Sequence, residues 1–124
     1  MLGGIVGKIL RVNLSDKSIT AQGYDEDLFK KYIGGDGVAA RLLYDELPLG
    51  IHPLEPENIL VISAGPLVGT NLQASCNTSV VAKSPITGFT LYNSHVNGSF
   101  AHQLKFAGYD ALVIRGKATN PVYL

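Results

Sequence analysis

The chain has 124 residues, of which 46% are hydrophobic and 16% are charged, and its 10 acidic residues balance its 10 lysines and arginines. This length suits one domain with its own core, and the zero net charge gives no electrostatic basis for binding nucleic acid or an anionic membrane. The single cysteine excludes an intrachain disulfide and a multi-cysteine metal or iron–sulfur site built from this chain alone, so a cytoplasmic location is expected.

The first third of the chain predicts a β-hairpin followed by two helices. Mixed apolar and polar residues predict a strand over 5–14, and a turn at 15–18 leads into a returning strand over 19–22. Acidic residues at 25–27 and basic residues at 30–31 predict a helix whose charges match the helix dipole. Gly34 and Gly35 are expected to end this first helix. Asp36 is expected to cap a second helix from Gly37 to Leu47.

The middle of the chain predicts one buried strand between two irregular segments. Prolines make residues 49–58 an extended, rigid connector. The apolar run from Ile59 to Ala64 predicts a strand buried on both faces, and it is far too short to cross a bilayer. Gly65-Pro66 ends this strand, and a polar loop follows over residues 67–77.

A hairpin around a Lys-Ser-Pro corner is the feature around which the chain is organised. Val80 to Ala82 suit a half-buried strand, Ser84-Pro85 disfavours a helix, and Thr87-Gly88 supplies a turn before a returning strand over 89–92. The polar residues at its outer ends are expected to form two loops over one face: Gln73, Ser75, Cys76, Asn77 and Thr78 on one side, and Asn93, Ser94, His95 and Asn97 on the other. Such loops would form a scaffold for holding a ligand.

The last part of the chain predicts a helix and a strand. Ser99 or Asn97 is expected to cap a helix over Phe100–Phe106, which ends at Gly108. Residues 111–115 predict a strand, and residues 122–124 begin another. Together these elements predict an α+β fold in which helices pack on β-sheets.

Three histidines are candidates for catalysis or metal binding. His95 and His102 lie near Ser94 and Ser99, but a serine–histidine nucleophile also needs an orienting carboxylate and an oxyanion hole. The sequence has no Gly-x-Ser-x-Gly elbow, so surface histidines are the favoured interpretation. A metal site that adds the distant His52 is equally disfavoured.

Glycines and asparagines offer weaker signals for ligand binding. Residues 65–70 (GPLVGT) lack the Gly-Lys-Ser/Thr of a P-loop; they either approach a phosphate through backbone amides or form a strand-ending turn. Cys76 has neither a basic neighbour nor a helix start beside it, so a small buried residue rather than a reactive thiol is expected. The amides of Asn77, Asn93 and Asn97 suit a phosphate, a pterin or a hydrated cation, although each alone is more often a turn residue.

Eight short stretches, taken in their order along the chain, match the pattern of a known protein family. They are GKILRVNL (7–14), YIGGDG (32–37), PLEPEN (53–58), AGPLVGT (64–70), KSPITGF (83–89), LKFAGYDA (104–111), GKA (116–118) and PVY (121–123). In this order they resemble the N-terminal domain of the tungsten-dependent aldehyde:ferredoxin oxidoreductase family. Each stretch alone is weak evidence for the family, but eight stretches in register from one end of the chain to the other are specific to it.

The resemblance implies an enzyme that oxidises an aldehyde with water to a carboxylate and passes electrons through a [4Fe–4S] cluster to ferredoxin. In the family, tungsten (or molybdenum) is held by the dithiolenes of two pterins, and magnesium bridges their phosphates. Residues 1–124 would be an incomplete N-terminal domain, about its first three fifths, that supports this tungstopterin. The cluster cysteines and acid/base groups would lie in the remaining domains or in a partner subunit, so no catalytic residue is expected here.

A few site residues carry over from the resemblance. In aldehyde-oxidising members of the family, a basic residue contacts a pterin phosphate. Asn77 stands at the matching position in this chain, so a charge-assisted hydrogen bond to the phosphate would become a neutral one. An asparagine that helps to hold the magnesium matches Asn93-Ser94, or Asn97-Gly98 because the loop is longer in this chain. We therefore expect cofactor binding by Asn77, Asn93, Ser94, Asn97 and Gly98, with Asn93 as the metal ligand.

Two alternative functions stay open. Cys76-Asn77 is similar to the aryl-CoA reductase branch of the family, whereas Lys83 to Gly88 are similar to the aldehyde branch. The chain is alternatively a non-catalytic binding or assembly module that kept the fold and lost the cofactor. An unpaired sheet edge also predicts self-association into a homo-oligomer.

Overall fold

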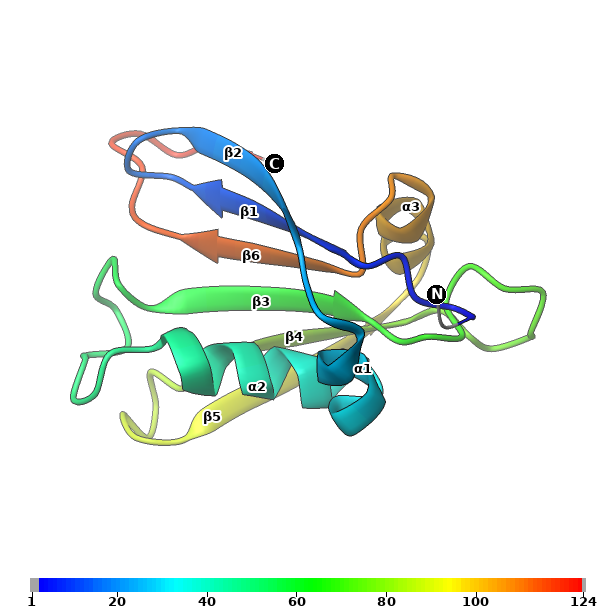
Figure 1. The fold of residues 1–124 in the computed structure, drawn as a ribbon. Helices are drawn as coiled ribbons and strands as arrows, with labels where there is room; N and C mark the ends of the chain where they lie inside the picture. The colour runs from blue at the N-terminus through cyan, green and yellow to red at the C-terminus, as the bar shows by residue number, and fades with distance from the viewer. Residues whose placement is uncertain (1–2, 124) are drawn as a thin grey trace.

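A computed structural model describes residues 3–123, which form one six-stranded mixed sheet with helices on both faces (Figure 1). The elements in chain order are β1 (Lys8–Asn13), β2 (Ser18–Gly23), α1 (Glu26–Tyr32), α2 (Gly35–Glu46), β3 (Ile59–Ala64), β4 (Asn77–Lys83), β5 (Leu91–Asn97), α3 (Phe100–Phe106) and β6 (Ala111–Arg115). The strands lie in the order β2-β1-β6-β3-β4-β5, with β1 and β6 parallel and all other neighbours antiparallel. The predicted α+β fold is confirmed.

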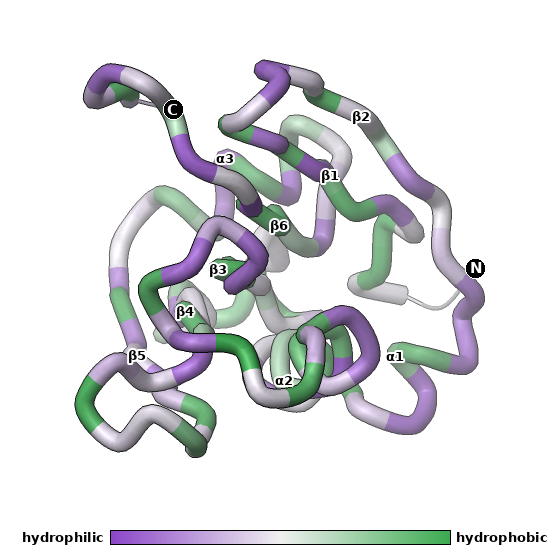
Figure 2. Tube along the Cα trace, turned by 90° about the vertical axis from the view of Figure 1, so that its left-hand side faces the viewer, coloured by the Kyte–Doolittle hydropathy of each residue, from purple (hydrophilic) through white to green (hydrophobic). Residues whose placement is uncertain are grey.

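The larger core lies between the sheet and helices α1 and α2. Side chains alternate between the faces of a strand, and those on this face pack against Phe29 of α1 and against the apolar side of α2. The core residues are Ile9, Phe29, Val38, Ala39, Leu42, Leu43, Ile59, Val61, Val81, Ala111 and Val113. Figure 2, which looks from the side of Figure 1, shows α1 and α2 together below the sheet.

The opposite face of the sheet packs against α3. Leu104 of α3 contacts a second apolar cluster that includes Val12, Leu112 and Ile114. Because α3 has only seven residues, it covers one end of this face (Figure 1). No helix within residues 3–123 is long and apolar enough to cross a membrane.

Several element boundaries differ from the sequence-based predictions. The first strand begins at Lys8 rather than Ile5. Helix α2 begins at Gly35, two residues early, with Gly34 as its N-cap; Asp36, the predicted cap, lies in the first turn. Residues 116–123 form no strand, so the prediction of one from Val122 is wrong for residues 122–123, and Leu124 lies outside the described residues.

The second predicted loop beside the central hairpin is a strand, whereas the first is a strand only at Asn77 and Thr78 and remains a loop at Gln73, Ser75 and Cys76. β4 begins at Asn77 and β5 continues to Asn97, so the polar residues there pair in the sheet, whereas Phe89 belongs to the connecting turn. The Thr87 and Thr90 hydroxyls bond each other at 2.6 Å in that turn. An exposed edge strand carries polar side chains without losing its backbone hydrogen bonds, and for this reason hydrophobic alternation did not reveal it.

A buried network around the Lys105–Asp110 ion pair joins the N-terminal segment to α3 and to the start of β6. Asp110 is fully buried and accepts a hydrogen bond from the buried ammonium of Lys105. The same carboxylate accepts the Tyr24 hydroxyl and the backbone N–H groups of Val6 (3.0 Å) and Gly7 (2.7 Å). These donors satisfy a charge that would otherwise be costly to bury.

The network shifts the pKa of both of its acidic members. Burial alone would raise the pKa of Asp110, but the hydrogen bonds from Lys105, Tyr24 and the backbone outweigh it, and the pKa is lowered. Burial, followed by the hydrogen bond to Asp110, raises the pKa of the Tyr24 hydroxyl. Folding is therefore favoured by an ionised Asp110 and a protonated Tyr24.

We expect Asp110→Asn to lower the free energy of unfolding by roughly 3–5 kcal/mol, because it leaves the buried Lys105 ammonium without its counter-charge. The matched control is Asp45→Asn, which breaks the partly exposed Arg41–Asp45 pair and should cost at most about 0.5 kcal/mol. Urea unfolding measures both variants. Equal losses would contradict the role assigned to the buried pair.

The same network predicts how stability depends on pH. Because the pKa of Asp110 is lowered in the fold, its contribution is complete above the unfolded value of about 3.9 and is lost as pH falls below it. Because the pKa of Tyr24 is raised, its contribution is complete below about pH 10 and is lost above it. Thermal unfolding of Tyr24→Phe should therefore show a weaker alkaline decline, and an unchanged decline would refute this.

Candidate functional site

The register of β4 and β5 brings three predicted site residues to one face of the sheet. Asn77 pairs directly with Asn97, and Asn93 pairs with Val81. Positions two and four residues apart on a strand share a face, and Val81 belongs to the core beneath α2. Asn77, Asn93 and Asn97 therefore lie on the α2 side of the two strands, all exposed; we call this group the asparagine face.

The other two predicted residues lie elsewhere. Ser94 pairs with Val80 and lies on the opposite side of β5 from Asn93. Gly98 follows the last residue of β5 and has a φ of 142°, a conformation that favours glycine at the junction with α3. The structure thus brings the three asparagines together and separates Ser94 from them.

His95 joins the asparagine face to helix α2. Its Nε2 atom lies 3.3 Å from Oδ2 of Asp36 and 3.4 Å from Nδ2 of Asn93. The side chains of His95 and Asp36 are each 46% exposed. Sequence reasoning treated His95 as a surface histidine, although the alternation Asn93-x-His95-x-Asn97 already predicts one shared face if the segment is a strand.

Glycines allow the N-terminus of α2 to approach β4 closely. A Cβ atom at Gly35, where φ is +52°, would lie 3.2 Å from the Ser79 hydroxyl, and one at Gly37 would lie 2.4 Å from the carbonyl oxygen of Tyr32. Ser79 is the cross-strand partner of His95. The approach of Gly35 to Ser79 places the first turn of α2, including Asp36, beside the asparagine face, while Gly37 lets the same turn lie against the end of α1.

Two buried oxygens near this helix start have no protein partner. Oδ1 of Asp36 and the hydroxyl of Ser63 accept and donate no hydrogen bond within the described residues. Ser63 is fully buried and pairs with Ser79 in the sheet. Buried polar atoms normally have a partner, so this region retains unused hydrogen-bonding capacity.

The donor set of the asparagine face fits a phosphate and a hydrated divalent cation. Carboxamide N–H groups donate to phosphate oxygens, and carboxamide oxygens are suitable ligands for magnesium. The described residues contain no group of three or more His, Cys, Asp or Glu that could hold a metal.

The remaining candidates do not form a site. Ser94 and His95 are consecutive strand residues and point to opposite faces, which rules out a direct serine–histidine pair between them. In the glycine-containing loop, the N–H groups of Val68 and Thr70 donate to carbonyls within the same loop, which favours the turn interpretation. Cys76 is a free, half-buried thiol rather than a buried one.

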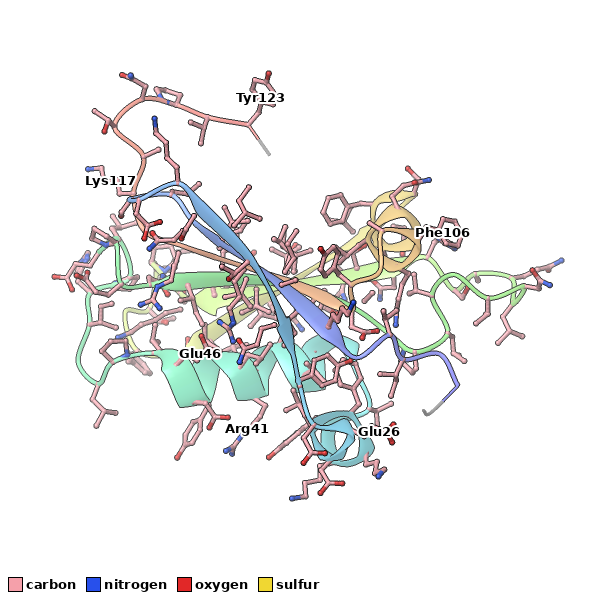
Figure 3. The ribbon with its side chains drawn as sticks, turned by 45° about the horizontal axis from the view of Figure 1, so that its top comes forward. Glu26, Arg41, Glu46, Phe106, Lys117 and Tyr123 are labelled. Atoms are coloured by element: carbon pink, nitrogen blue, oxygen red, sulfur yellow. The ribbon has the colours of Figure 1, made fainter. Side chains whose placement is uncertain are left out.

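Two surface hollows lie away from the asparagine face. One, of about 210 Å³, lies near the connector before β3 and the end of β6. The other, of about 350 Å³, lies between α1 and α2 and includes Arg41. Figure 3 shows Arg41 pointing away from the sheet. Neither hollow contains a predicted site residue.

Comparison with known proteins gives consistent matches over almost the entire chain. The model of the family described as "Aldehyde ferredoxin oxidoreductase, N-terminal domain" matches residues 9–124. Proteins named tungsten-containing aldehyde ferredoxin oxidoreductase are similar to the chain: the one from Pyrococcus furiosus is 50% identical over 95% of the chain, and the one from Thermococcus kodakarensis is 46% identical over the same share. The chain spans only 19% of the length of each of these relatives.

A solved structure confirms the fold. It is described as the active site complex BamBC of benzoyl coenzyme A reductase in complex with 1,5-dienoyl-CoA, and it covers the whole chain with a TM-score of 0.95 and 37% identity. The chain again spans 19% of the matched chain. The resemblance identified from the eight sequence stretches is thereby confirmed at the level of both sequence and fold.

We expect Gly35→Ala to destabilise the chain by more than Gly50→Ala. Both glycines have positive φ, but an added Cβ meets the Ser79 hydroxyl only at Gly35 and meets nothing within 4 Å at Gly50. The conformation alone costs roughly 1–2 kcal/mol, and the contact adds to it at Gly35. Chemical unfolding of both variants measures the excess, which Ser79→Ala should relieve. If Gly35→Ala and Gly50→Ala lowered the free energy of unfolding equally, the approach of α2 to β4 would not be tight.

Proposed function

The chain belongs to the aldehyde ferredoxin oxidoreductase family, and we propose that it is the N-terminal, cofactor-supporting segment of a tungsten- or molybdenum-dependent bis-pterin oxidoreductase. The complete protein would oxidise aldehydes to carboxylic acids with ferredoxin as the electron acceptor. The names of the relatives support tungsten and an aldehyde substrate. The observation that carries the proposal is the register that places Asn77, Asn93 and Asn97 on one face.

This chain would bind and orient the cofactor rather than perform the reaction. When bound, the tungsten–pterin group supplies the two-electron redox chemistry. Asn77 and Asn97, directly opposite each other, would donate hydrogen bonds to phosphate oxygens, and the Asn93 carboxamide oxygen would bind the bridging magnesium. Gly98 would let the chain turn away into α3 beside the phosphate. Because Ser94 lies on the other side of β5, we no longer assign it a direct contact.

The parts of the reaction that this chain lacks would come from elsewhere in a larger protein. Its single cysteine cannot hold a [4Fe–4S] cluster, so the cluster and the acid/base groups would belong to the remaining domains or to a partner subunit. Residues 1–124 would then be the first part of a longer N-terminal domain. Self-association through the edge strands β2 and β5 stays a prediction.

A second candidate function is reduction of an aryl-CoA substrate by a related cofactor. It is favoured by the 37% identity and TM-score of 0.95 to the benzoyl coenzyme A reductase complex. Assays of the full-length protein with an aldehyde and with an aryl-CoA ester distinguish the two. Activity on the thioester alone would replace the first proposal.

Elemental analysis of the full-length protein tests the proposal. We expect tungsten or molybdenum, magnesium and phosphorus to copurify with it, and their complete absence would favour a module that has lost the cofactor.

Asn77→Arg should slow the loss of tungsten during dialysis roughly tenfold, because a charge-assisted hydrogen bond replaces a neutral one. Ser94→Arg, on the other side of β5, is the matched control and should change nothing.

A further inference from the structure

One asparagine of the asparagine face differs chemically from the other two. Asn97 is followed by glycine, whereas Asn77 is followed by threonine and Asn93 by serine. No other asparagine in the whole sequence precedes a glycine. Asparagine is among the residues that are chemically unstable on heating, because the backbone nitrogen of the next residue can attack its carboxamide carbon. A glycine nitrogen attacks most readily, since no Cβ atom hinders its approach.

The structure leaves the carboxamide of Asn97 free to react. The residue is exposed, and its side chain makes no hydrogen bond within the described part of the chain. Other asparagines are held in place: Nδ2 of Asn13 donates to Asp16 at 2.9 Å, and Nδ2 of Asn58 donates to the carbonyl oxygen of Pro53 at 2.6 Å. A carboxamide held in this way does not turn toward the next backbone nitrogen, and Asn97 has no such restraint.

The backbone around Asn97 has the space that the reaction needs. Asn97 is the last residue of β5, an edge strand whose one neighbour is β4, so backbone hydrogen bonds hold it on one side only. Gly98 has a φ of 142°, and a Cβ atom there would meet nothing within 4 Å. The junction of Asn97 and Gly98 therefore has room to rotate out of the extended conformation, as the attack requires.

We propose that Asn97 deamidates spontaneously and that this reaction changes the asparagine face from neutral to acidic. The backbone nitrogen of Gly98 forms a bond to Cγ of Asn97, the bond from Cγ to Nδ2 breaks, and ammonia leaves with the proton of the Gly98 N–H. A water molecule then opens the cyclic succinimide at either of its carbonyl carbons. The product is aspartate or isoaspartate, and no oxidant or reductant takes part.

The new carboxylate would lie where the proposed function requires a phosphate. Asn97 is the direct cross-strand partner of Asn77, and directly opposed residues of a sheet have Cβ atoms about 4.5–5.5 Å apart. Asp36 already places one carboxylate beside this face, 3.3 Å from Nε2 of His95. A second carboxylate would repel a phosphate bound between the paired asparagines. This consequence, unlike the modification itself, rests on the proposed function.

The test is peptide mass spectrometry of the full-length protein, before and after prolonged incubation under conditions in which it stays folded. We expect the peptide that contains Asn97 to exchange ammonia for water several-fold faster than any other asparagine peptide. Asn71 is the matched internal control, because it is also exposed but is followed by leucine, whose side chain hinders the attack. Isoaspartate in the Asn97 peptide identifies the succinimide route, because direct hydrolysis of the carboxamide gives only aspartate.

Three variants show what the modification does. Asn97→Gln keeps a carboxamide but forms the corresponding larger ring slowly, so it should stay unmodified at this position. Asn97→Asp has the charge of the product and the shape of asparagine, so the full-length variant should lose tungsten and phosphorus during dialysis about tenfold faster than freshly prepared wild type. Ser94→Asp adds the same charge on the opposite side of β5 and should change nothing. Far-UV circular dichroism confirms that each variant is folded.

The outcomes separate this inference from the proposed function. An Asn97 that stays unmodified, or that is modified no faster than Asn71, would overturn the inference and leave the proposed function intact. Modification of Asn97 in a protein that holds no tungsten, molybdenum or phosphorus would support the inference and overturn the proposed function. Equal retention of tungsten by Asn97→Asp and fresh wild type would overturn the effect of the modification on the cofactor.

Discussion

Asp110 is the point at which distant parts of this fold are joined. Its carboxylate accepts hydrogen bonds from the buried Lys105 ammonium, the Tyr24 hydroxyl and the backbone of Val6 and Gly7, and its own N–H donates to the carbonyl oxygen of Lys8. A buried charge of this kind tolerates little displacement, because each lost donor leaves it partly uncompensated. It therefore holds the segment before β1 against the start of β6, where these two strands pair in parallel.

With the sheet fixed in this way, its two faces have different roles. One face is covered by α1 and α2 over a continuous apolar core, while α3 covers one end of the other. The core ends toward β5, where the side chains become polar and exposed. The candidate site lies at that edge because the edge strand β5 is held by its backbone hydrogen bonds to β4 rather than by apolar burial, so most of its side chains are exposed.

The start of α2 links the core to the site. Gly35 lets the helix approach Ser79, which brings Asp36 against His95. The three asparagines on this face are exposed and uncharged, so their carboxamide groups are the polar groups that β4 and β5 offer beside the start of α2.

The sequence by itself determined the family and most of the local elements, but not β5. Charges at 25–27 and 30–31, the apolar run at 59–64 and Gly108 after α3 are local signals, and each predicted its element because caps, dipoles and periodicity act over a few residues. The three asparagines were also identified from sequence, although as loop residues. Only the tertiary structure decided that they lie on one face, because that depends on the register of β4 against β5. The same is true of the Asp110 network and the His95–Asp36 pair, whose members lie up to 104 residues apart, and no local pattern encodes such contacts.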